Sequence, residues 1–148
     1  MKGAATRTTT HVTELNEIDD LRLFGPLWRS LTRPMADVSF VQSLEFLRAA
    51  WSVLGEGRRL RVVLVHEHGE VVCVLPLACF ASGASVAGLR QVTHAVPEFG
   101  LWSAPVGPAS VTAVKLALQH LTGSARDWDV LELTDWADAV AGPSVLET

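Results

Sequence analysis

The sequence has few cysteines, no long apolar run and no excess of positive charge, and each absence excludes a class of protein. Two cysteines in 148 residues cannot supply the disulfide framework of a small secreted domain. The longest apolar run, Val71–Ala81, is much shorter than the roughly 20 residues of a membrane-spanning helix. The formal net charge of -4 argues against a general nucleic-acid-binding protein, because such proteins need cationic groups to displace the counterions of phosphates.

The start of the sequence also lacks the features of a secretory signal. The segment MKGAATRTTTHVTEL carries two early positive charges but no apolar stretch of about 7–15 residues. We therefore expect a cytoplasmic protein without a transmembrane segment. Cys73 and Cys79 lie in one predicted strand, about 20 Å apart, which is too far for a disulfide. We expect both thiols to be buried.

Apolar residues are abundant. Hydrophobic residues make up 49% of the sequence and charged residues 19%, which predicts a folded chain with a buried core. The length suits one domain over residues 1–148. The apolar patterns predict strands over residues 7–13, 60–66, 71–80, 86–93 and 128–133, and helical segments over residues 16–33, 44–54 and 108–122.

Individual residues predict how these elements begin and where they are interrupted. Asn16 and Ser43 are suitable N-caps, since their side chains can accept from backbone N–H groups. Pro26 and Pro108 are predicted to begin helical segments, because the first turn of a helix does not use its N–H groups. Pro76 also lacks an N–H, so we expect a bulge or an unpaired edge in the strand that contains it.

The order of the elements predicts the fold class. Strands placed between helices are typical of an α+β or three-layer αβα domain. The three middle strands predict antiparallel pairing, with a hairpin between the first two, whereas the last helix and strand require a crossover onto the same sheet. We therefore expect a mixed, mostly antiparallel sheet. The only basic cluster, Arg58, Arg59 and Arg61, flanks a strand and is expected to be solvated.

Common catalytic and metal-binding patterns are missing from the sequence. His66 and His68 lie at the predicted hairpin tip without a second His/Cys pair at zinc-ligand spacing, so a turn is favoured over a metal site. There is no G-x-S-x-G, G-x-G-x-x-G or G-x-x-x-x-G-K-[ST] pattern. Both cysteines lie in an apolar strand, which raises a thiol pKa and argues against a nucleophile.

The segment HAVPEFGLWSAP, which begins at His94, is the strongest candidate site. His94 and Glu98 are potential acid–base groups, and Phe99 and Trp102 are available to shape a pocket. The alternative is a strand connection whose aromatic residues cover the edge of the sheet. We name His94, Glu98 and Trp102 as candidate substrate-binding residues, and we assign no catalytic residue and no metal ligand. Weaker candidates follow the last predicted strand: Asp135, Trp136 and Asp138.

Four segments, taken in order, resemble one protein family. They are FVQSLEFLRAAW, LRVVLVHEHGEVVCVLPLACF, LRQVTHAVPEFGLWSAPV and DWDVLEL. Together they resemble the amino-terminal half of the GNAT-superfamily acyltransferases of the CelD-like, or cellulose-biosynthesis, type, which are related to the FemAB-like proteins. The resemblance covers about residues 10–138 and depends on the order and spacing of the segments more than on any single one.

The resemblance implies the acyl-CoA N-acyltransferase fold, in which a strand, two helices and an antiparallel sheet precede a helix that crosses to a further strand. Two such modules usually lie in tandem, and acetyl-CoA or another acyl-CoA is expected to bind the carboxy-terminal one. The sequence departs from an active enzyme, because it lacks the Q/R-x-x-G-x-G/A pattern and contains no tyrosine to act as general acid. We therefore expect a partial module that is inactive alone and pairs with a carboxy-terminal module or a homodimer partner.

Two functions follow from these observations. The first is the amino-terminal module of a GNAT-like acyltransferase, which transfers an acyl group from acyl-CoA to an amine-type acceptor. The alternative is a stand-alone, non-catalytic α+β domain that binds a ligand or a partner. An unrelated enzyme is the third and least favoured interpretation.

Overall fold

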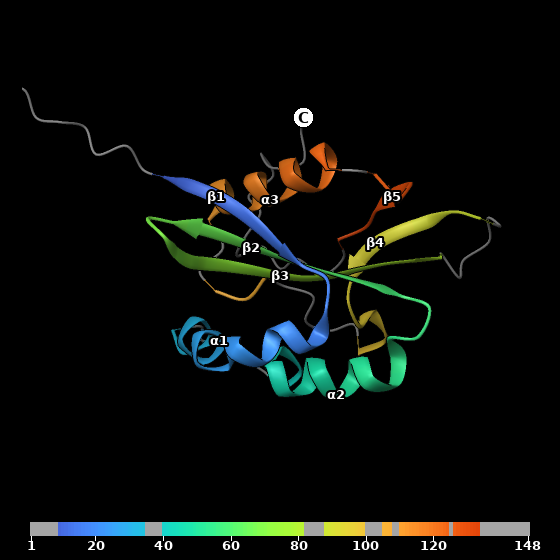
Figure 1. Cartoon of the computed structure of the whole chain (residues 1–148), viewed down its shortest axis with the longest axis horizontal. Helices are drawn as coiled ribbons and strands as arrows, with labels where there is room; N and C mark the ends of the chain where they lie inside the picture. The colour runs from blue at the N-terminus through green and yellow to red at the C-terminus, as the bar shows by residue number, and fades with distance from the viewer. Residues whose placement is uncertain are drawn as a thin grey trace, which may run out of the picture.

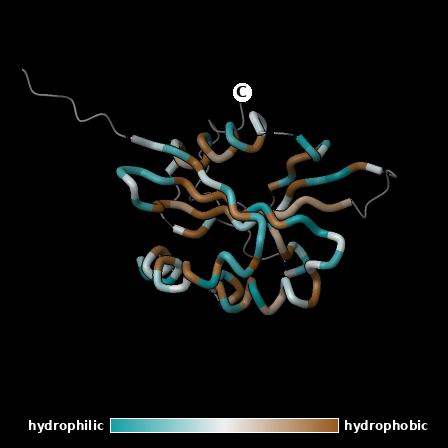
Figure 2. The backbone as a smooth tube through the Cα atoms, in the orientation of Figure 1, coloured by the Kyte–Doolittle hydropathy of each residue, from teal (hydrophilic) through white to brown (hydrophobic). Residues whose placement is uncertain are grey.

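The computed structural model describes residues 9–34, 40–81, 88–99, 105–107, 110–124 and 126–133. These residues form a mixed five-stranded sheet with helices on both faces, so the chain is α+β with αβα layers, as predicted (Figure 1). The middles of the two central strands are hydrophobic, as expected for strands covered on both faces (Figure 2).

The sheet has the strand order β1-β2-β3-β4-β5. The first four strands pair antiparallel and β5 pairs parallel to β4, which confirms the predicted crossover. The β2–β3 turn is His68-Gly69, and both residues have a positive φ, as a type I′ hairpin turn requires. The strands are β1 (Thr10–Leu15), β2 (Arg59–Glu67), β3 (Glu70–Ala81), β4 (Arg90–His94) and β5 (Val130–Leu131).

One face of the sheet carries the first helices and the other face carries the last. The helical elements on the first face are η1 (Ile18–Phe24), α1 (Gly25–Thr32), η2 (Phe40–Gln42) and α2 (Leu44–Leu54). Trp28, Leu44 and Leu47 from these elements pack with Val62 and Val74 of the sheet. Helix α3 (Val111–Gly123) covers the opposite face, where its buried residues pack with the alternate residues of β2 and β3. A short helix, η3 (Pro97–Phe99), follows β4.

Two helices begin at serine caps: the cap at Ser43 was predicted, whereas the cap at Ser110 lies two residues after the predicted helix start at Pro108. The Ser43 hydroxyl accepts from the N–H of Phe46, and the Ser110 hydroxyl accepts from the N–H of Ala113. Helix α3 therefore begins after Ser110, while Pro108 lies outside the described residues. The predicted Asn16 cap is wrong. Its amide instead donates to the Glu14 carboxylate and to a carbonyl of β2, and the 3-10 helix η1 begins at Ile18 without a side-chain cap.

Strand β3 changes its neighbour at Pro76. Pro76 lies opposite Val62 of β2, and its missing N–H faces the other edge, where β4 pairs only as far as Leu77. If β4 continued in that register, Val74 would lie opposite residue 97, yet it exchanges both backbone hydrogen bonds with Val106. The predicted unpaired edge is therefore at Pro76, whereas the bulge in the β2–β3 ladder lies nearer the hairpin, at the Val65–His66 step.

Gly107 allows this second neighbour to approach β3. A Cβ at this position would lie 2.7 Å from the carbonyl oxygen of Val72, and the residue has a φ of +102. Only glycine combines that backbone conformation with so close a contact. The return of the chain to β3 at residues 105–107 therefore depends on a residue without a side chain.

Candidate functional site

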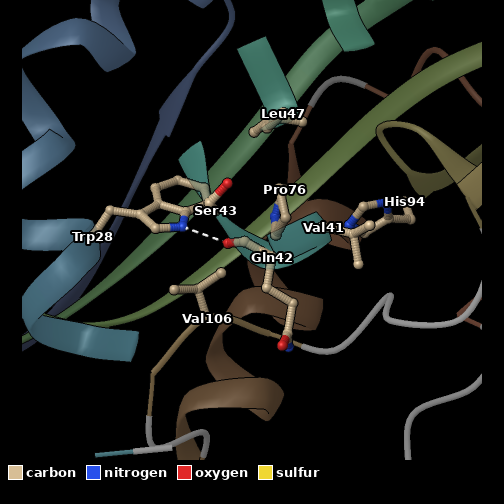
Figure 3. Close-up of a pocket in the computed structure, with 8 residues that line it drawn as sticks. All are labelled: Trp28, Val41, Gln42, Ser43, Leu47, Pro76, His94 and Val106. Atoms are coloured by element: carbon tan, nitrogen blue, oxygen red, sulfur yellow. Dashed lines mark hydrogen bonds between the residues drawn. The ribbon is translucent and has the colours of Figure 1, made fainter. Parts of the chain in front are cut away.

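A pocket lies at the point where the neighbour of β3 changes from β4 to residues 105–107. The cavity itself is small, about 10 Å³, which is room for about one water molecule, and the wider space of about 250 Å³ in front of it is counted together with open solvent. Figure 3 shows the eight residues that line it, and they come from both the helical layer and the sheet. They are Trp28, Val41, Gln42, Ser43, Leu47, Pro76, His94 and Val106.

The helical layer forms one side of the pocket and is held together by hydrogen bonds. Trp28 of α1 is 3% exposed, and its indole N–H donates to the carbonyl of Gln42 at 2.8 Å. This bond ties α1 to η2, and the Ser43 cap then begins α2 directly after it. Leu47, one turn into α2, completes the apolar wall. Three helical segments therefore fix the wall that faces Pro76 and His94.

His94 is the titratable side chain on the pocket wall. The N–H of Val96 donates to His94 Nδ1 at 3.3 Å, so Nδ1 is unprotonated and the proton of the neutral ring lies on Nε2. Burial lowers the pKa of His94 from 6.5 to about 4, against a small opposing effect of the Val96 bond. The ring is therefore neutral at pH 7 and offers an N–H donor. Figure 3 shows it at one end of the pocket, pointing toward Val41.

Glu98 does not share the pocket with His94. Both oxygens of its carboxylate bond to the guanidinium of Arg58, which is 13% exposed and also donates to the carbonyl of Ala95. The hydrogen bond from Arg58 lowers the pKa of Glu98. The arginine stacks on the ring of Phe80, 4.6 Å from its centroid. Glu98 thus holds the connection after β4 in place. The Arg58 side chain is mostly covered, at 13% exposed, rather than solvated as predicted, whereas Arg59 is 56% exposed, as predicted.

The other predicted site residues are only partly described. The backbone of Phe99 belongs to η3, but its side chain is not described. Trp102 lies outside the described residues. The same holds for the three weaker candidates: Asp135, Trp136 and Asp138. The structure therefore places one of the three named candidates, His94, in the pocket and assigns a different contact to Glu98.

A second polar cluster, not predicted from the sequence, lies on the α3 face of the sheet. Arg61 is 3% exposed, so the expectation that it is solvated was wrong. Its Nε and Nη2 atoms bond to the two Glu14 oxygens at 2.7 and 3.1 Å, and Nη1 lies 3.4 Å from Asp127. His120 of α3 bonds to Glu14 at 2.8 Å, and Arg59 bonds to Asp127 at 2.6 Å.

The charges of this cluster explain why it can be buried. Burial alone would raise the pKa of Glu14, but hydrogen bonds from Arg61, Asn16 and His120 outweigh it and lower the pKa from 4.5 to about 2. The same Glu14 contact raises the pKa of Arg61. The cluster joins β1, β2, α3 and residue 127 and has internal partners for both carboxylates, so we interpret it as a structural element.

The histidines and cysteines of the β2–β3 hairpin are held in packing or turn positions. His68 lies in the turn, as predicted, and His66 stacks on His11 with ring centroids 4.2 Å apart. Burial lowers the pKa of His66, and the nearby charge of His11 lowers it further. Both cysteines are buried, and burial raises the pKa of Cys73 to about 12. Among the described residues, no three His, Cys, Asp or Glu side chains are grouped closely enough to hold a metal ion.

Comparison with known proteins adds no family to this picture. No family model, no curated protein and no solved structure gives a significant match to the chain. None of the helices in the described ranges has the length and apolarity needed to cross a bilayer. The element order and the pocket at the end of β4 are therefore the features of this chain that bear on its function.

Proposed function

We propose that this chain is the amino-terminal module of a GNAT-like acyltransferase, which transfers an acyl group from acyl-CoA to an amine-type acceptor. The observation that supports this most directly is the order of the elements. A strand, two helices and three antiparallel strands precede α3, which returns the chain so that β5 pairs parallel to β4. This is the order that the sequence resemblance implies for the acyl-CoA N-acyltransferase fold.

The pocket supports a role for this module on the acceptor side of the reaction. It lies between the helical layer and the edge where β3 changes neighbours, and His94 contributes a neutral hydrogen-bonding group. Acyl transfer requires that the two reactants are held in a defined geometry, and a pre-formed pocket with a fixed polar group can provide that. We assign Glu98 to positioning of the connection between β4 and α3, through Arg58.

The chain lacks the donor-binding pattern Q/R-x-x-G-x-G/A, so we assign acyl-CoA binding to a second module or a second subunit. The proposed function of this chain is therefore acceptor or product binding. The ring of His94 is a donor at neutral pH, so we do not assign it the role of a general base that deprotonates an amine.

The test is a titration of the ¹⁵N-labelled chain with ethylamine, N-ethylacetamide and acetyl-CoA, followed through its backbone amide signals. We expect the amine or its acylated product to shift signals of residues 94–98 and of the pocket wall, and acetyl-CoA to have a smaller effect. The variant Leu47→Phe should block the pocket from α2. Its matched control is Val53→Phe on the same helix, where the side chain is 77% exposed. If none of the three compounds shifts any signal, the acyltransferase assignment is wrong.

A non-catalytic binding domain is the second candidate function. It is favoured by three large apolar side chains that are mostly exposed, namely Leu23 at 88%, Val53 at 77% and Phe40 at 72%. We rank it second because single exposed apolar side chains are common on protein surfaces. Light scattering over a range of protein concentrations distinguishes the two, since Leu23→Ser and Val53→Ser should weaken self-association only if these residues form an interface.

A further inference from the structure

Strand β1 lies at one end of the strand order, on the side of the sheet away from β4 and β5 (Figure 1). The His68 N–H donates to the Thr9 carbonyl at 3.1 Å, and this pair continues the β1–β2 register. Bonded pairs recur at every second residue of an antiparallel ladder, so the backbone groups of His11 and Thr13 face β2. The N–H and C=O groups of the residues between them therefore point away from the sheet.

The outward-facing backbone groups of β1 belong to Thr10, Val12 and Glu14. In the part of the chain that the structure describes, no group bonds to these N–H and C=O groups. An open strand edge is a template for a further strand, and proteins commonly block it with proline, lysine or a bulge. The sequence of β1, THVTEL, contains no proline, lysine or glycine, and its register with β2 has no irregularity. This edge therefore carries none of the usual obstacles to pairing.

The one carboxylate of β1 does not oppose the approach of another strand. The Glu14 oxygens accept from two nitrogens of Arg61, from Asn16 and from His120, over distances of 2.7 to 3.1 Å. Four such bonds fill the acceptor sites of a carboxylate. The Glu14 side chain is only 12% exposed, and it lies beside a guanidinium. An approaching strand therefore meets a carboxylate whose charge is already compensated within the chain.

A second copy of β1 matches this edge in the antiparallel orientation. The three outward-facing residues are spaced evenly about Val12, so a two-fold axis at Val12 pairs all of them. Val12 then lies opposite Val12 of the second copy, and Thr10 lies opposite Glu14 of the second copy. Each of these pairs forms two bonds, which gives about six backbone hydrogen bonds. A register centred on Glu14 would instead place two like charges opposite each other.

We propose that the edge of β1 is a self-association surface, at which a second copy of this chain adds its β1 antiparallel about Val12 and extends the sheet. An interface of one strand from each copy is small, so we expect a weak dimer with a Kd on the order of 100 µM. The pocket near Pro76 of β3 lies outside this interface, because β2 separates β1 from β3. The surface depends on β1 alone and holds whether or not the chain is an acyltransferase.

The first experiment measures hydrogen exchange of the backbone amides in the unmodified chain. It compares protein at about 20 µM and about 1 mM, on either side of the expected Kd. Exchange at Thr10, Val12 and Glu14 should slow about fourfold at the higher concentration, because the monomer fraction falls from about 0.8 to about 0.2. Exchange at His11 and Thr13 should change little, since their N–H groups are bonded to β2 in the monomer as well.

The second experiment removes the central hydrogen bonds. Val12→Pro lacks the outward N–H but keeps the ladder with β2, and proline is tolerated at such an edge position. It should raise the dimer Kd at least about tenfold in analytical ultracentrifugation, and thermal melting confirms that the variant folds. The matched control is Val53→Ser, which removes an exposed apolar side chain of α2 and should leave the Kd unchanged.

The third experiment tests the register by disulfide formation between copies. Val12→Cys should cross-link to itself under mild oxidation, because bonded residues directly opposite each other have Cα atoms about 5.5 Å apart. Thr10→Cys should not, because the two copies of residue 10 would lie four residues apart along the strands, about 13 Å. Both native cysteines are buried, so the new thiol is the one that reacts.

Each outcome supports or overturns the proposal. Protection of Thr10, Val12 and Glu14 that is equal at both concentrations would mean that a segment of the same chain occupies the edge. Absence of protection at either concentration would mean that the edge stays open. Both results overturn the proposal, as does cross-linking of Thr10→Cys without cross-linking of Val12→Cys. A dimer that is lost in Val53→Ser but kept in Val12→Pro would place the interface on the helical layer instead.

Discussion

Replacement of Glu14 by glutamine tests the structural role assigned to the buried cluster. The variant keeps the shape of the side chain but removes the charge that Arg61 contacts through two nitrogens. The Arg61 side chain is 4% exposed, and its remaining carboxylate partner, Asp127, lies 3.4 Å away. A buried cation would therefore lose its main partner, and such losses cost about 3–5 kcal/mol in the free energy of unfolding.

The pKa of Glu14 gives a second value for the contribution of this residue to the free energy of unfolding. The folded value of about 2 lies below the ordinary value of 4.5, and each pKa unit corresponds to about 1.4 kcal/mol, so ionised Glu14 contributes about 3 kcal/mol. A lowered carboxyl pKa stabilises the fold above the unfolded value, and the contribution is lost as the pH falls from 4.5 towards 2. The unmodified chain should therefore lose stability in this range more steeply than Glu14→Gln.

The assay is urea unfolding at pH 7 and at intervals down to pH 3. Glu45→Gln is the matched control, because it removes an ion pair with Arg29 whose side chains are both more than 60% exposed. That pair should contribute no more than about 1 kcal/mol. The reasoning would be refuted if Glu14→Gln cost no more than Glu45→Gln at pH 7, or if the unmodified chain and Glu14→Gln lost stability in parallel below pH 4.5.

Three further predictions concern single positions. Gly107→Ala should destabilise the fold by about 1–3 kcal/mol in urea unfolding, and Gly69→Ala should cost less. Both glycines have a positive φ, but only at Gly107 would the new Cβ lie 2.7 Å from a backbone oxygen. Equal costs for the two variants would contradict this. Cys73, with a pKa of about 12, should not react with a thiol reagent at pH 8 until the chain unfolds. Arg58→Met should raise the pKa of Glu98 toward its ordinary value in an NMR titration, and an unchanged pKa would show that their bond does not form in solution.

Local patterns were sufficient to predict most of the elements. The spacing of Leu44, Leu47 and Trp51 predicted a helix, and the Ser43 cap in the structure agrees with it. The Val- and Leu-rich segments predicted a hairpin, which the β2–β3 pairing confirms. Boundaries were less accurate. The last strand was predicted over six residues, yet only Val130 and Leu131 pair with β4, because pairing depends on a neighbouring strand that the local pattern does not contain.

The polar clusters depended on contacts between residues distant in sequence. Glu14 and Arg61 are 47 residues apart, and only the β1–β2 register brings them together on one face. Arg58 appeared solvated because three arginines lie close together in the sequence, but its guanidinium reaches Glu98, 40 residues further on. A buried arginine needs a partner that offsets the cost of removing its charge from water, and that partner comes close only in the folded chain.

Composition and local periodicity were enough to predict the α+β class, the buried cysteines and the loss of pairing on one edge of β3 at Pro76. The chemistry of His94, in contrast, depends on contacts that form when the chain folds. Its neighbour Val96 fixes the ring tautomer, and the return of residues 105–107 to β3 helps to enclose the pocket around it. A side chain's chemistry is set by the dielectric and the hydrogen-bond partners around it, and those exist only once distant segments pack together.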